Sequence, residues 1–387
     1  MASLFNGGSV SPLTLTLFSS GSGSGSGESL PFDLIVEILY RLPVKLLLQL
    51  RCVCKSWNFI ISDPKFARKH LTHSTTLGLH LLSCFKPPHK CSLKPYLLHA
   101  VIPNVTTNFT RTVYPHNNFN GYYYILTGLN CFVGSCHGLL CLSNHFGGLV
   151  IIWNPSIRKI NELPLIQMPK TSGAIRVEYS FGFGYDHVND DYKVVVLLSS
   201  ILFDNNYYMG IYVEKTQVKV HTLGTDYWKS IPDFPFGGIL VRDSGQFVSG
   251  TINWLAYDKN SNWEGHSFII SFDLKKECFR QILQPDYEDI RASARQLGVW
   301  KDCMWVVSGR DVWLMKEYGN KESWTKLFTI SCDFWKVKNI LEDDQVLLES
   351  NEKMSVYNFK NHTFKFTKFG RCQEEICVES LISPFPP

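Results

Sequence analysis

The sequence predicts a mainly β protein with a small α-helical domain near its N-terminus. Aromatic residues make up 14% of the chain, with 17 Tyr, 26 Phe and 10 Trp, and these side chains favour the pleated, half-buried surface of a sheet. Helical spacing of apolar residues is confined to residues 29–71. Beyond residue 75, short apolar runs alternate with Gly, Asn, Asp and Pro clusters, as in a succession of strands. At 387 residues, the chain is long enough for one large domain and one small one.

The first 28 residues have a different composition. They include an alternating Gly/Ser stretch over residues 21–27, and the side chains there cannot offset the backbone entropy lost on folding. We therefore expect a disordered tail over residues 1–28, a small helical domain over residues 29–71 and a β domain over residues 75–387.

The helical region shows the apolar rhythm of short helices broken by prolines. Apolar residues lie at 34, 35, 38, 39 and 42, and Pro43 must interrupt that helix because it lacks the N–H group. The rhythm resumes from Leu46 to Trp57, and Asp63-Pro64 stops it. The pattern predicts three short helices. Because so small a unit buries little of its own apolar surface, part of that surface must be covered by a partner or by the rest of the chain.

The β region contains a rough internal repeat. An apolar strand ends in Asn or Asp, crosses a polar turn and resumes with an aromatic or apolar strand, as from Ile151 to Ile160 and from Ile269 to Phe279. With further strand pairs between these hairpins, the spacing favours a β-propeller-like domain of about six or seven blades, closed by strands from both ends near residues 76–79 and 378–381. A pair of β-sandwiches is the alternative.

The helical region contains a series of short motifs: Leu30-Pro31-Phe32-Asp33-Leu34, Glu37-Ile38-Leu39, Arg41-Leu42-Pro43, Leu47, Arg51-Cys52-Val53-Cys54-Lys55-Ser56-Trp57 and Asp63-Pro64-Lys65-Phe66. In these residues it resembles an F-box. The β region contains Gly134-Ser135-Cys136-His137-Gly138-Leu139-Leu140-Cys141, Trp153-Asn154-Pro155-Ser156, Phe181-Gly182-Phe183-Gly184-Tyr185-Asp186 and Gly250-Thr251-Ile252-Asn253-Trp254-Leu255. In these residues it resembles the F-box-associated, kelch-like interaction domain of plant proteins.

The resemblance implies a non-catalytic adaptor in a Skp-cullin-F-box (SCF) ubiquitin ligase. In that role the F-box binds a Skp-family adaptor, and through it cullin and RING subunits, while the β domain recruits a protein substrate for ubiquitination and proteasomal degradation. The expected adaptor-binding residues are Leu30, Pro31, Leu34, Ile35, Ile38, Leu39, Leu42, Pro43, Leu47 and Trp57. An F-box scaffold that acts outside a ligase is the alternative function.

Three motifs could instead indicate chemistry. Gly134-Ser135-Cys136-His137-Gly138 has the glycine spacing of a nucleophile elbow, but an apolar strand follows it where a helix would be needed. Cys131, Cys136 and Cys141 lack the Cys-x-x-Cys pairing typical of zinc sites. Phe181-Gly182-Phe183-Gly184 lacks the third glycine and the helix of a phosphate-binding loop. We therefore expect no catalytic residue, no metal and no cofactor.

Charge and hydropathy point to no further class of partner. A net charge of +4 is too small to suggest nucleic acid or a membrane surface, and no apolar run is long enough to span a bilayer. The N-terminus lacks the positively charged start of a signal peptide. The expected location is the cytoplasm, the nucleus or both, with reduced cysteines.

The substrate-binding residues are harder to predict. Three aromatic and Asn-rich stretches, residues 116–124, 203–208 and 260–266, suit protein recognition, although ordinary solvent-exposed loops have the same composition. The candidate substrate-binding residues are Tyr207, Tyr208 and Trp263.

Overall fold

The computed structural model divides the chain into two compact units, residues 1–75 and residues 76–387. The described residues are 31–73, 77–84, 91–97, 132–143, 148–167, 176–203, 211–231, 234–236, 239–241, 244–258, 267–287, 294–331, 336–341, 344–350, 353–366 and 373–385.

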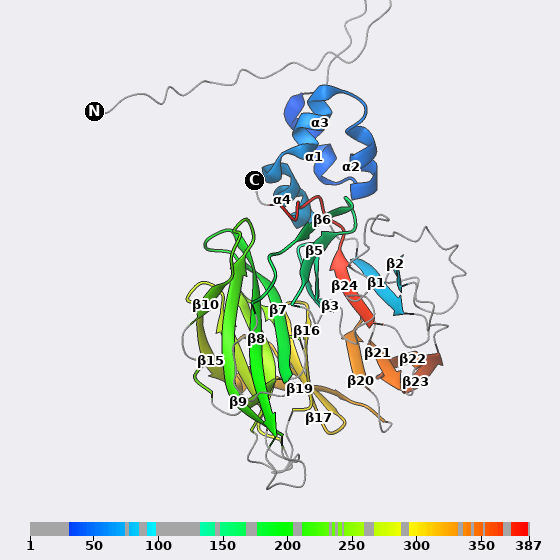
Figure 1. Cartoon of the computed structure of the whole chain (residues 1–387). Helices are drawn as coiled ribbons and strands as arrows, with labels where there is room; N and C mark the ends of the chain where they lie inside the picture. The colour runs from blue at the N-terminus through cyan, green and yellow to red at the C-terminus, as the bar shows by residue number, and fades with distance from the viewer. Residues whose placement is uncertain are drawn as a thin grey trace, which may run out of the picture. The chain divides into compact units, whose positions relative to one another are not determined.

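The first unit, here called the helical unit, contains four helices rather than the expected three. They are α1 (Phe32–Tyr40), α2 (Val44–Leu50), α3 (Lys55–Ser62) and α4 (Pro64–His73) (Figure 1). Pro43 separates α1 from α2, as predicted. Asp63-Pro64 ends α3 but also starts α4, because the missing N–H of proline is not needed in a first turn. The Asp63 carboxylate accepts a hydrogen bond from the backbone N–H of Lys65 at 2.8 Å, which fixes this start.

The helical unit has a core to which all four helices contribute. The ring of Tyr40 stacks on that of Phe66 with centroids 4.7 Å apart, which joins α1 to α4. Nε2 of His70 lies 2.8 Å from the Leu42 carbonyl oxygen, so α4 is also tied to the turn before Pro43. The buried side chains are those of Ile35, Leu39, Tyr40, Val44, Leu47, Ile61, Phe66, Ala67 and His70.

The second unit is a β-propeller, and the alternative of paired β-sandwiches is wrong. Blade 1 consists of β3 (Phe132–Cys136), β4 (Leu139–Ser143), β5 (Val150–Asn154) and β6 (Lys159–Glu162). Blade 2 consists of β7 (Arg176–Asp186), β8 (Asp191–Phe203), β9 (Ile211–Thr222) and β10 (Lys229–Ile231). Blade 3 consists of β11 (Ile239–Val241), β12 (Gln246–Val248), β13 (Thr251–Asp258), β14 (Ser267–Asp273) and β15 (Cys278–Ile282).

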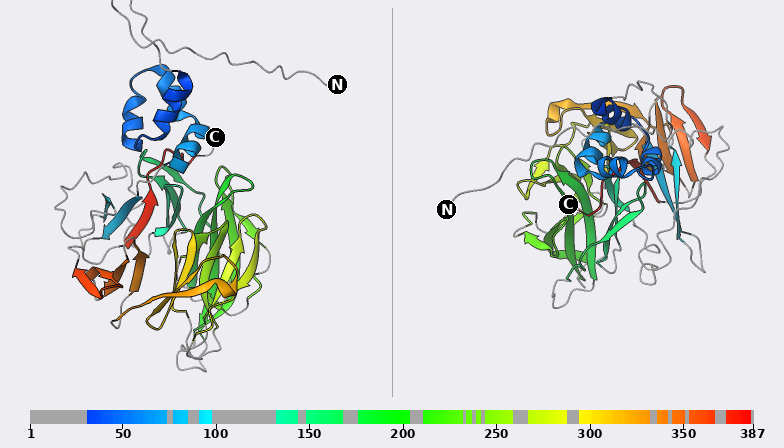
Figure 2. Two further views of the ribbon diagram at one scale, coloured as in Figure 1. Left: turned by 180° about the vertical axis from the view of Figure 1, so that it is seen from behind. Right: turned by 90° about the horizontal axis from the view of Figure 1, so that it is seen from above.

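Two more blades and a smaller sheet complete the unit (Figures 1 and 2). Blade 4 consists of β16 (Gln296–Trp300), β17 (Cys303–Ser308), β18 (Asp311–Met315) and β19 (Trp324–Thr329), with the short 3₁₀ helix η2 (Lys321–Ser323) before β19. Blade 5 consists of β20 (Lys336–Ile340), β21 (Gln345–Ser350), β22 (Lys353–Asn358) and β23 (Thr363–Phe366). The closing sheet joins β2 (Cys91–Leu97), β1 (Leu77–Cys84) and β24 (Gln373–Val378).

The expected count of about six or seven blades is wrong, because the described residues form five blades and the three-stranded closing sheet. The predicted count came from dividing the available number of residues by the typical number of residues in a blade. It could not anticipate that β7, β8 and β9 use 11, 13 and 12 residues, which leaves less chain for further blades. The closure by both chain ends is confirmed, since β1 pairs with β24. The C-terminal strand, however, lies at Gln373–Val378 and not at residues 378–381 as predicted.

Hairpins of two kinds recur in the blades. In blades 1, 3 and 4 a two-residue turn joins the strands of one hairpin, and both turn residues have positive φ, which matches the twist of the paired strands. These turns are His137-Gly138, Ser249-Gly250 and Lys301-Asp302. In blades 1, 3 and 5 a four-residue loop follows an Asn or Asp at the end of the next-to-last strand. These residues are Asn154, Asp273 and Asn358, so the Asn/Asp hairpin predicted from the sequence is confirmed.

The apolar core lies between neighbouring blades. Side chains of blade 2, such as Val195 and Val218, pack with Trp254 and Ile270 of blade 3. The glycines of β7 allow this close approach: a Cβ on Gly182 would lie 2.3 Å from Cγ2 of Ile252. The Phe-Gly-Phe-Gly motif is therefore a packing feature of the propeller.

No helix in the described part of the chain is long and apolar enough to cross a membrane.

Candidate protein-interaction surfaces

The helical unit exposes an unusual amount of apolar surface. Leu34 and Ile38 are 52% and 50% exposed, and because they lie four residues apart they share one face of α1. Pro31 and Pro43 are exposed as well, while Leu42 and Trp57 are half-buried. These six of the ten expected adaptor-binding residues are accessible to a partner.

Three other expected adaptor-binding residues are not accessible. Ile35, Leu39 and Leu47 are buried in the core of the helical unit, with exposed fractions of 6%, 1% and 0%. The structure places them inside the helical unit and not on its surface. Helical spacing identifies apolar faces but cannot separate an inner face from an outer one. Their side chains belong to the core of the helical unit. The tenth residue, Leu30, lies outside the described residues.

Further apolar side chains are exposed although they were not among the expected adaptor-binding residues. Phe59 on α3 is 78% exposed, and Val53, Leu46 and Phe32 are also exposed. An exposed Phe is unusual in a stable surface, and several exposed apolar side chains in so small a unit are typical of a protein-binding surface. The sequence did indicate this surface, because these helices contain more apolar residues than a single buried face can hold.

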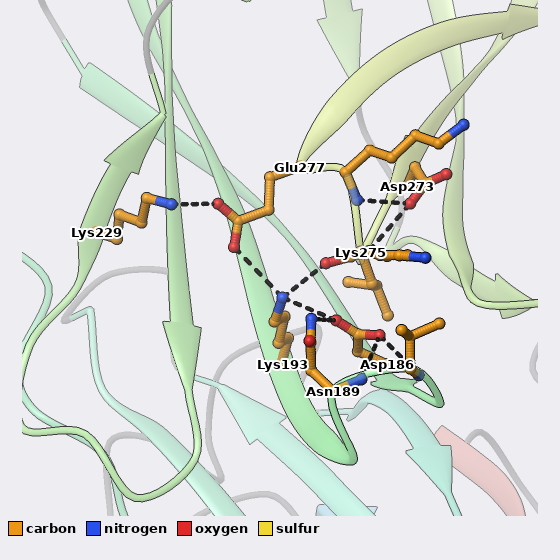
Figure 3. A network of polar contacts seen from close by, with 10 residues as sticks. Asp186, Asn189, Lys193, Lys229, Asp273, Lys275 and Glu277 are labelled. Atoms are coloured by element: carbon orange, nitrogen blue, oxygen red, sulfur yellow. Dashed lines mark hydrogen bonds and ion pairs between the residues drawn. The ribbon is translucent and has the colours of Figure 1, made fainter.

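One end of the propeller, here called the hairpin end, carries the tight turns and is held by buried polar groups. The ammonium of Lys193 lies between two carboxylates, 3.1 Å from Asp186 and 3.3 Å from Glu277, and donates to the Leu274 carbonyl oxygen at 2.7 Å (Figure 3). Glu277 also pairs with Lys229 at 2.5 Å. This cluster, here called the Lys193 clamp, joins blade 2 to blade 3.

The charges of the Lys193 clamp are balanced and its polar groups are satisfied. Burial alone would raise the pKa of Asp186, but hydrogen bonds from the side chain of Asn189, from Lys193 and from backbone N–H groups outweigh it and lower the pKa. Lys193 itself is almost fully buried. A buried lysine with this many partners has a structural role, and the sequence signal was a lone lysine at the start of an apolar strand run, Tyr192 to Val196.

Asn154 holds the C-terminal segment against blade 1. Its Nδ2 donates to the carbonyl oxygens of Ser380 and Ile382 at 3.0 and 2.7 Å, while its Oδ1 accepts from the backbone N–H of Ser156 at 2.8 Å. Asn161 adds a hydrogen bond to the Pro384 carbonyl oxygen at 2.9 Å. The Trp-Asn-Pro-Ser motif therefore closes a hairpin and also anchors residues 380–384.

The Gly-Ser-Cys-His-Gly motif forms a structural turn, as expected. Cys136 is buried at the end of β3, and burial, together with the Asp302 carboxylate, raises the pKa of its thiol well above the usual range. A protonated thiol is a poor nucleophile at neutral pH. His137 lies in the two-residue turn, where Nδ1 is 3.0 Å from the hydroxyl of Tyr192.

The described residues contain no group of three His, Cys, Asp or Glu side chains that could hold a metal ion. Cys136 and Cys141 are buried free thiols, and Cys131 lies outside the described residues.

The candidate substrate-binding residues Tyr207, Tyr208 and Trp263 lie outside the described residues. The strands that flank them are described: Phe203 pairs with Ile211 at the ends of β8 and β9, and Tyr257 pairs with Ser267 near the ends of β13 and β14. Both strand ends lie opposite the hairpin end, because β8 starts at the β7–β8 turn and β13 starts at the Ser249-Gly250 turn. We call this the loop end of the propeller.

Two family models match the chain. The F-box domain matches residues 28–69, and the F-box associated beta propeller domain matches residues 81–376. The chain belongs to the F-box proteins with an associated β-propeller. The family match agrees with the helical unit and with the propeller described above.

Two plant proteins resemble this chain over most of its length. The F-box/kelch-repeat protein At3g23880 of Arabidopsis thaliana is 30% identical over 375 residues, which cover 92% of this chain and 96% of the relative. The F-box protein CPR1 of the same plant is 26% identical, and the alignment covers 92% of this chain and 88% of CPR1. Among solved structures, a luciferin-regenerating enzyme aligns with this chain at 10% identity, and the alignment covers 64% of this chain and 78% of the enzyme chain. The TM-score of 0.36 is too low to carry a conclusion.

Proposed function

We propose that this F-box protein is the substrate-recognition subunit of an SCF-type ubiquitin ligase. Its F-box, residues 29–71, binds a Skp-family adaptor and through it the cullin and RING subunits. Its propeller, residues 75–387, binds a protein substrate and presents it for ubiquitination and proteasomal degradation. The observation that carries this proposal is the exposed apolar face of α1, with Leu34 and Ile38 about half exposed in a unit that otherwise has its own core.

The mechanism requires no catalytic group on this chain. A receptor that holds a substrate near a charged ubiquitin-conjugating enzyme raises the effective concentration of the substrate lysine, and proximity alone accelerates the transfer. F-box and propeller domains are typical of non-catalytic adaptor proteins, and the high pKa of the Cys136 thiol fits that role. The proposed place of action is the cytoplasm, the nucleus or both.

The test of adaptor binding uses charges on the exposed face of α1. Leu34→Asp with Ile38→Asp should weaken binding of a purified Skp-family adaptor by about a thousandfold, because each apolar anchor buried in the complex contributes about 2 kcal/mol or more and each 1.4 kcal/mol is a factor of ten. The variant should remain folded, since both side chains are half exposed. Leu165→Asp with Leu283→Asp is the matched control, because it makes the same chemical change at exposed leucines of the propeller. Wild-type binding by the folded α1 variant would refute the proposal.

Assembly with the cullin separates the two F-box functions. Adaptor-bound protein should co-purify with cullin and RING subunits and support ubiquitin transfer to a captured substrate. An adaptor-bound form that never joins a cullin would instead establish the scaffold function.

For the substrate, we propose that Tyr207, Tyr208 and Trp263 are binding residues; in the sequence they lie between β8 and β9 and between β13 and β14. Aromatic side chains supply large contact area at a low entropy cost. Their replacement with Ala should remove at least one protein captured in the presence of a proteasome inhibitor, with adaptor binding and the melting temperature unchanged. An unchanged set of captured proteins would exclude these residues.

A further inference from the structure

The helical unit carries an excess of positive charge. Over residues 31–73 it has seven basic side chains and only three acidic ones. The basic residues are Arg41, Lys45, Arg51, Lys55, Lys65, Arg68 and Lys69, and the acidic ones are Asp33, Glu37 and Asp63. The whole chain has a net charge of only +4, so this small unit has as large a net charge as the entire protein.

Three of these lysines have no acidic partner among the described residues. Lys45, Lys55 and Lys65 are exposed, one on each of α2, α3 and α4. By contrast, Arg41 pairs with Glu37 at 3.1 Å along α1. The three lysines are therefore solvated charges that contribute no ion pair to the described fold.

The placement of Lys55 and Lys65 is unfavourable for the helices themselves. The N-terminus of a helix carries a partial positive charge, so acidic residues stabilise the first turn and basic ones destabilise it. Helix α1 follows this rule with Asp33 in its first turn. Helix α3 has Lys55 in its first turn and no acidic residue there. Helix α4 also has a lysine, Lys65, in its first turn, although Asp63 just before that turn caps the helix. A basic residue in the first turn destabilises the helix, and where the fold gains nothing in return such a residue is expected at a functional surface.

We propose that Lys45, Lys55 and Lys65 bind acidic side chains of the protein that covers the exposed apolar residues of the helical unit. The partner surface is then an apolar groove with an acidic rim. This inference rests on the proposed function and adds the charge of the adaptor surface to it. The exposed apolar side chains of Leu34, Ile38 and Phe59 favour a protein over a nucleic acid, because a phosphate backbone offers no surface on which to bury them.

The test measures association kinetics and stability together. For the full chain and a purified Arabidopsis Skp-family adaptor, the association rate constant should fall with rising salt, because complementary charges steer the encounter. The triple variant Lys45→Glu, Lys55→Glu, Lys65→Glu should associate about tenfold more slowly at low salt and show little salt dependence. A triple Lys→Gln variant should lie between it and wild type. The melting temperature of the helical unit should stay the same or rise in both variants.

The control places the same charge change on the propeller. Lys159→Glu, Lys275→Glu, Lys276→Glu alters exposed lysines there and should change the association rate less than twofold. The inference is wrong if the helical-unit variant associates at the wild-type rate, if the propeller control is equally slow, or if the helical-unit variant melts lower. It is also wrong if the variant loses binding to a labelled DNA duplex but keeps adaptor binding.

The outcomes separate this inference from the proposed function. If the Leu34/Ile38 variant loses the adaptor while the lysine variants bind normally, the proposed function stands and the acidic rim is wrong. If the wild-type chain does not bind the adaptor at all, both proposals are wrong.

Discussion

The helical unit and the propeller differ in which side chains they bury and which they expose. The propeller buries charged side chains such as Lys193 and Asp186 and satisfies them across blade boundaries. The helical unit exposes Leu34, Ile38 and Phe59 and leaves lysines without acidic partners. The propeller thus pairs these buried charges internally, whereas the helical unit exposes apolar and basic side chains that a partner can bind. Stability and binding should therefore respond to different residues in the two units.

The largest loss of stability is expected from the Lys193 clamp. Lys193→Met keeps most of the side-chain volume but leaves Asp186 buried without its cation, and breaking a buried ion pair costs about 3–5 kcal/mol. Chemical denaturation, followed by tryptophan fluorescence, should show this loss in the free energy of unfolding of the propeller. Adaptor binding should not change, because the clamp belongs to the propeller. A loss below about 1 kcal/mol would show that the clamp is not a major source of stability.

Acid provides a control for that prediction. The pKa of Asp186 is lower in the folded protein than its unfolded value of about 3.9. The stability that the ionised carboxylate contributes is therefore present above that value and is lost as the pH falls through the folded pKa. The difference between wild type and Lys193→Met should be constant near neutral pH and shrink below about pH 4.

A smaller loss is expected where the C-terminal segment meets blade 1. Asn154→Ala removes the donors to the Ser380 and Ile382 carbonyl oxygens and the acceptor for the Ser156 N–H group. Leaving buried polar groups unpaired costs about 1–3 kcal/mol. The contribution of the C-terminal segment can be isolated by a double-mutant cycle with a chain that ends at residue 379. If Asn154 acts through this segment, its substitution should cost clearly less in the shortened chain, and equal costs in both chains would limit its role to the hairpin.

Sequence patterns predicted those parts of the fold that depend on local spacing. The Asn/Asp hairpins, the break at Pro43 and closure by both chain ends were predictable, because turn residues, prolines and terminal strands leave local signals. The fourth helix was missed because Asp63-Pro64 can end one helix and start the next. The Lys193 clamp was also missed, since Lys193 and Glu277 are 84 positions apart and come together only when blades 2 and 3 pack.

The same reasoning explains the partial success at the candidate site. The apolar periodicity of α1 identified Leu34, Ile35, Ile38 and Leu39 together, but this broad apolar face packs inward over only part of its width. Burial separated the pair Leu34 and Ile38 from the pair Ile35 and Leu39. Only packing of α4 against α1 decides which pair is inside, and α4 was not predicted.

The smallest effect on stability is expected from the exposed pair on α1, and it gives the sharpest comparison of the two units. Leu34→Ala with Ile38→Ala should change the stability of the helical unit by less than about 0.5 kcal/mol, because truncating exposed side chains leaves no cavity. Leu39→Ala, one position from Ile38 but 1% exposed, should cost about 2–5 kcal/mol. Circular dichroism melts of the full chain, read at the helical signal, compare the two. The ranking should reverse for adaptor binding by the folded proteins, where the Leu34/Ile38 variant loses affinity and the Leu39 variant retains it. If the exposed pair proved more important for stability than Leu39, Leu34 and Ile38 would be packed inside the protein. The partner would then have to bind another surface.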